Sequence, residues 1–196
     1  MVETIAPVVY GNRRRYFIAV ALHASTATLA AAALGALLGA IGGLFGAPWH
    51  GGGYAVVGGV GLLYALRELV GLPMPLFDRR KQVPQWWRTF YPRYVAASLY
   101  GTGLGVGYLT FLSYGTFVVV SVIAIVVGDP IVAALVVAPF GLARGLSVLV
   151  SARTDDEEGP LHLVAKLGRS SWIRRVKVAN GIACLVLAAV AATQFL

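Results

Sequence analysis

Residues Tyr16–Phe45 read YFIAVALHASTATLAAAALGALLGAIGGLF and contain no Asp, Glu, Lys or Arg. About 20 apolar residues in a helix cross a bilayer, so this stretch predicts a membrane span with residues to spare for tilting or kinking. Further apolar stretches follow at about residues 54–72, 94–127, 131–152 and 178–196. We therefore expect an all-α polytopic membrane protein, with about five transmembrane helices in a single domain over residues 1–196.

The composition favours a membrane protein over a soluble domain. The chain has 58% hydrophobic and 12% charged residues, whereas a soluble domain carries about 25% charged residues. Its formal net charge of +8 does not indicate a nucleic-acid partner, because the basic residues lie in loops beside the apolar stretches. Attraction to the lipid bilayer explains them. Cys184 is the single cysteine, so no intramolecular disulfide can form.

The basic residues also predict an orientation. Lys and Arg occur before the first apolar stretch and in the loops at about residues 73–93 and 153–177, but not in the connections at residues 46–53 and 128–130. Basic loops tend to stay in the cytoplasm. We therefore expect a cytoplasmic N-terminus, an external C-terminus and a multi-pass location in the plasma or inner membrane.

Three ionisable residues lie inside predicted spans, where charge is costly and often functional. Arg67 and Glu68 precede the cytoplasmic end of the second span, and Arg144 lies about two turns from that end of the fourth. Long Arg side chains can reach the headgroups, and Arg67 or Arg144 can pair with Glu68 inside the bundle. Alternatively, these charges line a polar cavity that opens to the cytoplasm.

A small polar cluster in the first span contains His23 together with nearby Ser and Thr residues. Such residues commonly form hydrogen bonds between membrane helices. The alternative is that His23 titrates near neutral pH and relays a proton or binds a ligand. His50 and His162 are expected in loops, and no set of His, Cys, Asp and Glu has the spacing of metal ligands. We expect neither a metal nor a cofactor.

The third apolar stretch contains the run YGTGLGVGYLTFLSYGT, residues Tyr100–Thr116. Its alternate glycines superficially resemble a dinucleotide-binding motif, but that motif needs a preceding strand in a soluble βαβ unit. The glycines either form a smooth face for a neighbouring helix or mark the unwound part of a broken helix, as in the binding sites of transporters. In the second case the ligand or translocation candidates are Tyr108, Thr110, Ser113 and Tyr114, with His23 and Arg144 as neighbours.

The order of these elements resembles the transmembrane domain of the cytochrome c biogenesis family, which comprises CcdA and the membrane core of DsbD within the wider LysE-type superfamily. The resemblance is carried by three segments: LGALLGAIGG (Leu34–Gly43), PMPLF (Pro73–Phe77) and PFGLARG (Pro139–Gly145). It implies a six-helix fold of three-plus-three inverted repeats.

The chain departs from that family at its redox positions. The family's first helix, which carries one cysteine, has no counterpart, and LTFLSYG (Leu109–Gly115) stands where the fourth helix carries its Pro-Cys. Cys184 lies in the last span, outside both positions. The resemblance therefore implies a degenerate version of the fold without dithiol electron transfer.

The sequence favours a non-catalytic subunit or scaffold of a membrane complex, because an incomplete repeat and glycine-rich helices leave faces for partner helices. The partners would be other membrane-protein subunits or a second copy of the chain. A small-solute or ion transporter, with its site at the third span, is the alternative. An enzyme acting on lipid-linked or quinone substrates is not expected, because no paired carboxylates or nucleophile–base set is evident.

Overall fold

The computed structural model describes residues 5, 7–76, 83–84, 86–110, 114–153 and 170–195, and all regular elements within them are helical. The elements are α1 (Pro7–Tyr10), α2 (Arg13–Leu44), α3 (His50–Leu69), α4 (Trp87–Phe90), α5 (Arg93–Gly105), α6 (Thr116–Val127), α7 (Pro130–Leu146), the 3-10 helix η1 (Ser147–Arg153) and α9 (Ser170–Phe195). The all-α prediction is confirmed for this part of the chain. In it, α2, α9 and α7 with the start of η1 are long and apolar enough to cross a membrane.

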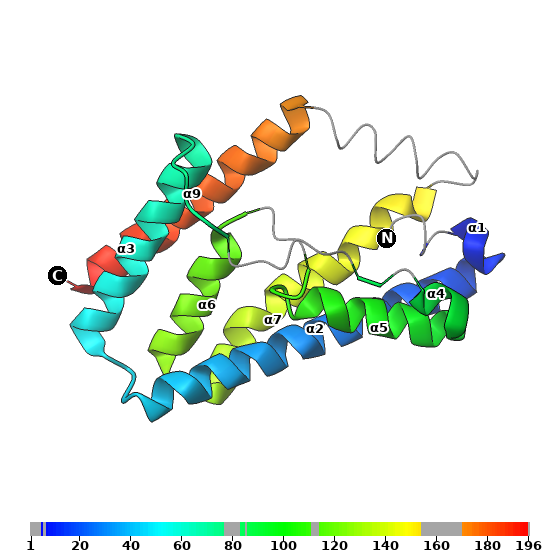
Figure 1. Cartoon of the computed structure of the whole chain (residues 1–196), viewed down its shortest axis with the longest axis horizontal. Helices are drawn as coiled ribbons and strands as arrows, with labels where there is room; N and C mark the ends of the chain where they lie inside the picture. Colours follow the sequence, from blue (N-terminus) through cyan, green and yellow to red (C-terminus); the bar gives the residue numbers. More distant parts are fainter. Residues whose placement is uncertain are drawn as a thin grey trace.

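The helices form two groups that α6 connects (Figure 1). α2 packs against α5 and α7, and α3 packs against α9, whereas α6 contacts helices of both groups. Phe117 of α6 is almost fully buried, and its ring stacks on Phe140 of α7 with 3.9 Å between the ring centroids. The short helix α6 therefore lies at the centre of the bundle.

Glycine lets α2 approach its neighbours closely. A Cβ atom added at Gly105 of α5 or at Gly141 of α7 would lie 2.1 or 2.3 Å from the carbonyl oxygen of Ala27. A Cβ atom added at Gly42 of α2 would lie 1.8 Å from the carbonyl oxygen of Ile125 in α6. Small residues at such crossings give membrane helices the van der Waals contact that holds them together.

Contacts between the helices fix their directions: α2, α5, α6 and α9 run one way, and α3 and α7 run the other. The pairs that establish these directions are Gly35 with Val137, Gly145 with Ala24, Gly101 with His23, Gly105 with Ala27, Gly53 with Val126, Gly115 with Tyr64, Gly58 with Ala191 and Gly181 with Glu68. As a result, α2, α5 and α9 begin toward the end of the bundle at which α3 and α7 finish. The described Lys and Arg residues of these helices all lie in the turns nearest this end, which we call the basic end.

The second predicted span is displaced. We expected it at residues 54–72, after a loop containing His50, but α3 begins at His50 and ends at Leu69. Its His-Gly-Gly-Gly start predicts a loop because glycine disfavours helix, yet the last glycine of the run packs against α6. Gly71, with a φ of +88°, then turns the chain away from the helix.

The other predicted spans differ mainly at their ends. α2 begins ahead of the predicted Tyr16, because the Asn12 side chain accepts a hydrogen bond from the backbone N–H of Arg14 at 2.8 Å and caps the helix. α9 begins at Ser170, ahead of the predicted 178–196, since charged residues on an exposed face do not end a helix. The fourth predicted span ends in the 3-10 helix η1 instead of α-helix.

The third predicted span, residues 94–127, is not one continuous helix. α5 ends at Gly105, α6 begins at Thr116, and the described residues between them form turns or bends, apart from the unclassified residue before Gly115. Gly101 packs against α2, whereas Gly107, with a φ of +69°, takes the chain out of the helix. Because α5 and α6 run in the same direction along α2, this stretch passes through the bundle once.

Candidate functional site

The break between α5 and α6 (residues 106–115, hereafter the helix break) has a charged side chain at each end. Every helix ends in carbonyls and begins with N–H groups that lack intrahelical partners. Arg144 Nη1 donates to the Leu104 carbonyl oxygen at 3.3 Å, and Glu68 Oε1 accepts from the Gly115 N–H at 3.1 Å. A cation at a helix C-terminus and an anion at an N-terminus both match the helix dipole. The two charges therefore stabilise the break.

Arg144 also binds the middle of the helix break. It donates to Thr110 Oγ1 at 3.2 Å, and its guanidinium carbon lies 5.5 Å from the centroid of the Phe140 ring. Thr110 is 4% exposed, and its hydroxyl donates to the Gly107 carbonyl at 3.1 Å. The two ligand candidates Arg144 and Thr110 are thus brought together, in contacts with the protein itself.

The remaining predicted site residues lie in different places. Tyr108 packs in the core, with 4.9 Å between the centroids of its ring and that of Phe117. His23 is 0% exposed and its Nδ1 lies 3.0 Å from the Ala97 carbonyl, while its Nε2 has no partner among the described residues. Ser113 lies outside the described residues, as does His162.

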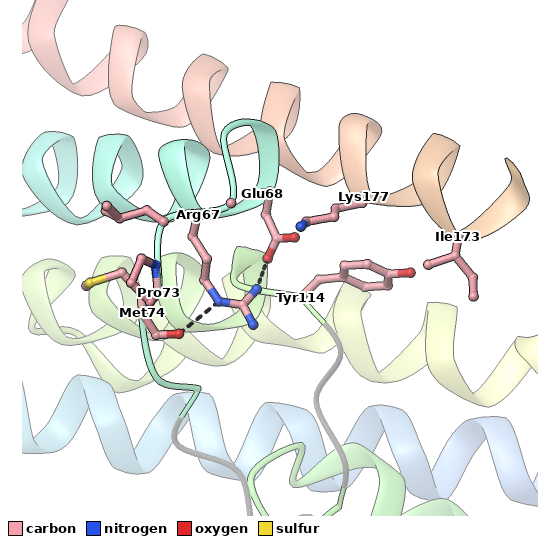
Figure 2. A pocket seen from close by; sticks show the side chains of 9 residues that line it. Arg67, Glu68, Pro73, Met74, Tyr114, Ile173 and Lys177 are labelled. Atoms are coloured by element: carbon pink, nitrogen blue, oxygen red, sulfur yellow. Dashed lines mark hydrogen bonds and ion pairs between the residues drawn. The ribbon is translucent and has the colours of Figure 1, made fainter. Parts of the chain in front are cut away.

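Tyr114 and Glu68 line an open cleft of about 550 Å³ at the basic end (Figure 2). Its walls are the end of α3, the segment that follows α3, and the first turns of α9. The other lining residues are Arg67, Gly71, Leu72, Pro73, Met74, Ile173 and Lys177. The cleft therefore combines charged groups with apolar lining residues.

Arg67 and Glu68 form an ion pair at the edge of this cleft (Figure 2). Arg67 Nη1 donates to Glu68 Oε1, and Arg67 Nε donates to the Met74 carbonyl at 3.0 Å. Glu68 is only 3% exposed, and its second oxygen, Oε2, has no partner among the described residues. A buried carboxylate oxygen without a hydrogen-bond donor destabilises the folded state. Glu68 Oε2 can therefore gain stability by accepting a hydrogen bond from a ligand.

The sequence reasoning missed the contribution of α9. Lys177 and Ile173 reach the cleft because α9 packs antiparallel to α3. No local sequence pattern predicts that these two helices pack together. Beneath the cleft, Thr116 donates to Asn180 Oδ1 at 2.6 Å and lies 3.7 Å from Cys184 Sγ. Asn180 did carry a signal, since an amide within an apolar span usually bonds to another helix.

The chemistry of this arrangement is that of binding. The cleft offers a guanidinium, an ammonium, a phenol and a carboxylate, which can orient a polar ligand by charge-assisted hydrogen bonds. Within the described ranges, no three His, Cys, Asp or Glu residues are grouped closely enough to hold a metal ion.

Comparison with known proteins points to one group of relatives. No family model and no solved structure matches the chain. It is 37% identical over 137 residues to the methylamine utilization protein MauF of Paracoccus versutus, 38% over 133 residues to that of Paracoccus denitrificans, and 33% over 131 residues to that of Methylorubrum extorquens. These matches cover 66–67% of the chain and 46–48% of each relative, so the chain spans about half the length of the curated relatives it matches.

These relatives show that the predicted resemblance to CcdA, DsbD and the LysE-type superfamily is wrong. That prediction rested on hydropathy and on the rhythm of Gly and Pro, which closely packed membrane helices share in general. The matches to MauF rest on residue identity instead. By sequence, the chain is similar to the methylamine utilization protein MauF.

Proposed function

We propose that this protein is an integral membrane protein that takes part in methylamine utilization, as a non-catalytic subunit or scaffold of a membrane complex. The observation that carries the proposal is the 37% identity to MauF over 137 residues. The three helices long enough to cross a bilayer support the membrane location.

The charges inside the bundle favour a scaffold over a translocation path. Arg144 is bonded to Leu104 and Thr110, and Glu68 is bonded to Arg67 and Gly115. A translocation path needs polar groups that face a cavity. Arg144 and one carboxylate oxygen of Glu68 bond to the backbone at the helix break and so stabilise the fold.

The directions of the helices support a cytoplasmic basic end. Arg13–Arg15 at the start of α2, Arg67 near the end of α3 and the basic residues at the start of α9 all lie toward the same end of the bundle. Basic residues concentrate on the cytoplasmic side of membrane proteins. The N-terminus is then cytoplasmic, and the end of α9 is outside, in the plasma or inner membrane.

Growth of a deletion strain tests the role in methylamine utilization. We expect a strain without this gene to lose growth on methylamine as its sole carbon or nitrogen source, and to grow normally on succinate with ammonium. A plasmid copy of the gene should restore growth on methylamine. Unimpaired growth of the deletion strain on methylamine would refute the proposal.

Native mass spectrometry of the protein, purified in mild detergent, tests the subunit role. We expect stoichiometric co-purification of another membrane protein. The transporter remains a second candidate because the cleft beside the helix break is about 550 Å³ and contains charged groups. Purification as a lone monomer or homodimer, with solute flux in proteoliposomes, would favour the transporter.

A further inference from the structure

The cleft at the basic end contains polar groups that bond to no other described residue or leave one atom without a described partner. Glu68 Oε2 is buried and has no partner among the described residues. Lys177 lines the cleft from α9, points toward Glu68 in Figure 2, and forms no ion pair or hydrogen bond with a described residue. Arg67 uses Nε and Nη1 in its bonds to Met74 and Glu68, and its third nitrogen bonds to no described residue.

The charges of these groups restrict the ligand. A simple cation would meet Glu68 but also the positive charges of Arg67 and Lys177, and a simple anion would meet the carboxylate of Glu68. A molecule with an ammonium close to an anionic group can satisfy both signs at once. Its ammonium would donate to Glu68 Oε2, and its anionic group would accept from Lys177 and Arg67.

The apolar lining residues and the position of the cleft further restrict the ligand. Leu72, Pro73, Met74 and Ile173 also line the cleft. The cleft lies at the end of α3 and the start of α9, where headgroups meet the cytoplasm if the basic end is cytoplasmic. Basic pockets between helices at this depth bind lipid headgroups. We therefore infer that the cleft binds a small zwitterion in which a primary ammonium lies a few bonds from a phosphate or carboxylate. A phosphatidylethanolamine headgroup and a free soluble zwitterion share this chemistry.

Matched ligands test the requirement for both charges and for N–H donors. Phosphocholine has three methyl groups in place of the three ammonium hydrogens of phosphoethanolamine, so it has no N–H donor for Glu68 Oε2. We expect phosphoethanolamine to raise the melting temperature of the purified protein, and phosphocholine, ethanolamine or inorganic phosphate to require an at least about tenfold higher concentration for the same shift, since each lacks one charge-assisted bond. A shift with phosphoethanolamine that any of the other three compounds equals at the same concentration would overturn the inference.

A second experiment, in lipid bilayers, distinguishes a phosphatidylethanolamine headgroup from a soluble zwitterion as the ligand. The protein is placed in nanodiscs of phosphatidylethanolamine with phosphatidylglycerol, or of phosphatidylcholine with phosphatidylglycerol, with identical acyl chains. A higher melting temperature in the ethanolamine discs, without an effect of soluble phosphoethanolamine, supports the inference and assigns the site to a lipid. An effect of the soluble compound supports a site open to the cytoplasm. If neither the soluble compounds nor the nanodiscs show a preference for ethanolamine, the inference is overturned.

Variants link the preference to the cleft. Lys177→Met removes the ammonium of the cleft, and Glu68→Gln removes the negative charge while it retains an oxygen for the Gly115 N–H. Glu68→Gln should abolish the preference over phosphocholine, and Lys177→Met should abolish the preference over ethanolamine, whatever they do to the melting temperature without ligand. Arg175→Met is the matched control, because Arg175 is an exposed residue of α9 outside the cleft. A preference that survives in both cleft variants would overturn the inference.

The inference goes beyond the role in methylamine utilization and does not depend on it. The growth phenotype is read in cells that lack the gene, and ligand preference is read on the purified protein. A protein needed for growth on methylamine but indifferent to phosphoethanolamine would refute the binding site alone. The reverse result would refute the metabolic role alone.

Discussion

At Glu68, one carboxylate oxygen accepts two hydrogen bonds, from the Arg67 guanidinium and from the Gly115 N–H that opens α6. Removal of one partner of a buried ion pair costs about 3–5 kcal/mol because the other charge is left uncompensated. Arg67 is partly exposed, so we expect a smaller loss, about 2–3 kcal/mol, for Glu68→Leu. Glu68→Gln should lose less, since its amide oxygen still accepts from Gly115.

Thermal unfolding of the two Glu68 variants in detergent checks this expectation. The melting temperature should be highest for the wild type, lower for Glu68→Gln and lowest for Glu68→Leu. A Glu68→Leu protein as stable as the wild type would mean that the carboxylate does not stabilise the start of α6, and the structural interpretation of Glu68 would be wrong.

Arg144 and Thr110 should behave as a coupled pair. Their hydrogen bond spans 3.2 Å and joins α7 to the helix break. In a double-mutant cycle, Arg144→Met and Thr110→Ala should together destabilise the protein by about 1 kcal/mol less than the sum of the single variants. Thr110→Ser, which keeps the hydroxyl, is the control and should retain the coupling. Strict additivity in denaturant unfolding would contradict a direct interaction.

At the scale of elements, glycines that look alike in the sequence have opposite consequences. Gly105 of α5 leaves no space for a methyl group, since its added Cβ would lie 2.1 Å from the Ala27 carbonyl oxygen. Gly59 of α3 faces open space, with nothing within 4 Å. We expect Gly105→Ala to destabilise the protein by about 1–3 kcal/mol, and Gly59→Ala to stabilise it by about 0.5–1 kcal/mol through the lower entropy of its unfolded chain.

Denaturant unfolding of both variants measures the difference directly. Both substitutions add one methyl group to a helix, so helix propensity favours both, and only the packing differs. If the two variants changed stability in the same direction, the close contact of α5 with α2 would not exist as described.

The sequence predicts the positions of the long helices, because each of them contains a long apolar run. The apolar runs indicate α2, α3, α7 and α9, but not their ends, because caps such as Asn12 and packing of the glycines after His50 decide those. The helix break was an open alternative, since glycine both ends helices and lines their contacts. Two of the groups in the cleft were also identifiable, because buried charge is rare in membrane spans.

Lys177 illustrates what the sequence could not supply. It is one of several basic residues before the last apolar stretch, and nothing local separates it from the exposed Arg174 and Arg175. It lines the cleft only because Gly181 lets α9 cross closely beside Leu69 at the end of α3. That contact joins residues more than one hundred positions apart in the chain, so it exists only in the folded bundle.

At the scale of the whole molecule, the bundle separates charge between its two ends. The described Lys and Arg residues of the long helices lie near the basic end, and the cleft opens there, whereas Asp129 caps α7 at the opposite end by accepting from the Val132 N–H at 2.8 Å. In the proposed orientation, with the basic end on the cytoplasmic side, the cleft would open to the cytoplasm. The orientation therefore decides which pool of ligands the cleft can reach.

Cysteine labelling in intact cells tests the orientation. In a Cys184→Ala background, Gly52→Cys places an exposed thiol near the start of α3, and Arg175→Cys places one near the start of α9, at the basic end. A membrane-impermeant maleimide should label the first variant in intact cells and the second only after permeabilisation, because a basic end belongs in the cytoplasm. Labelling of both variants in permeabilised cells shows that both thiols react. Labelling of Arg175→Cys from outside would reverse the topology and would place the cleft, with Glu68 and Lys177, on the external face, where a cytoplasmic ligand could not bind.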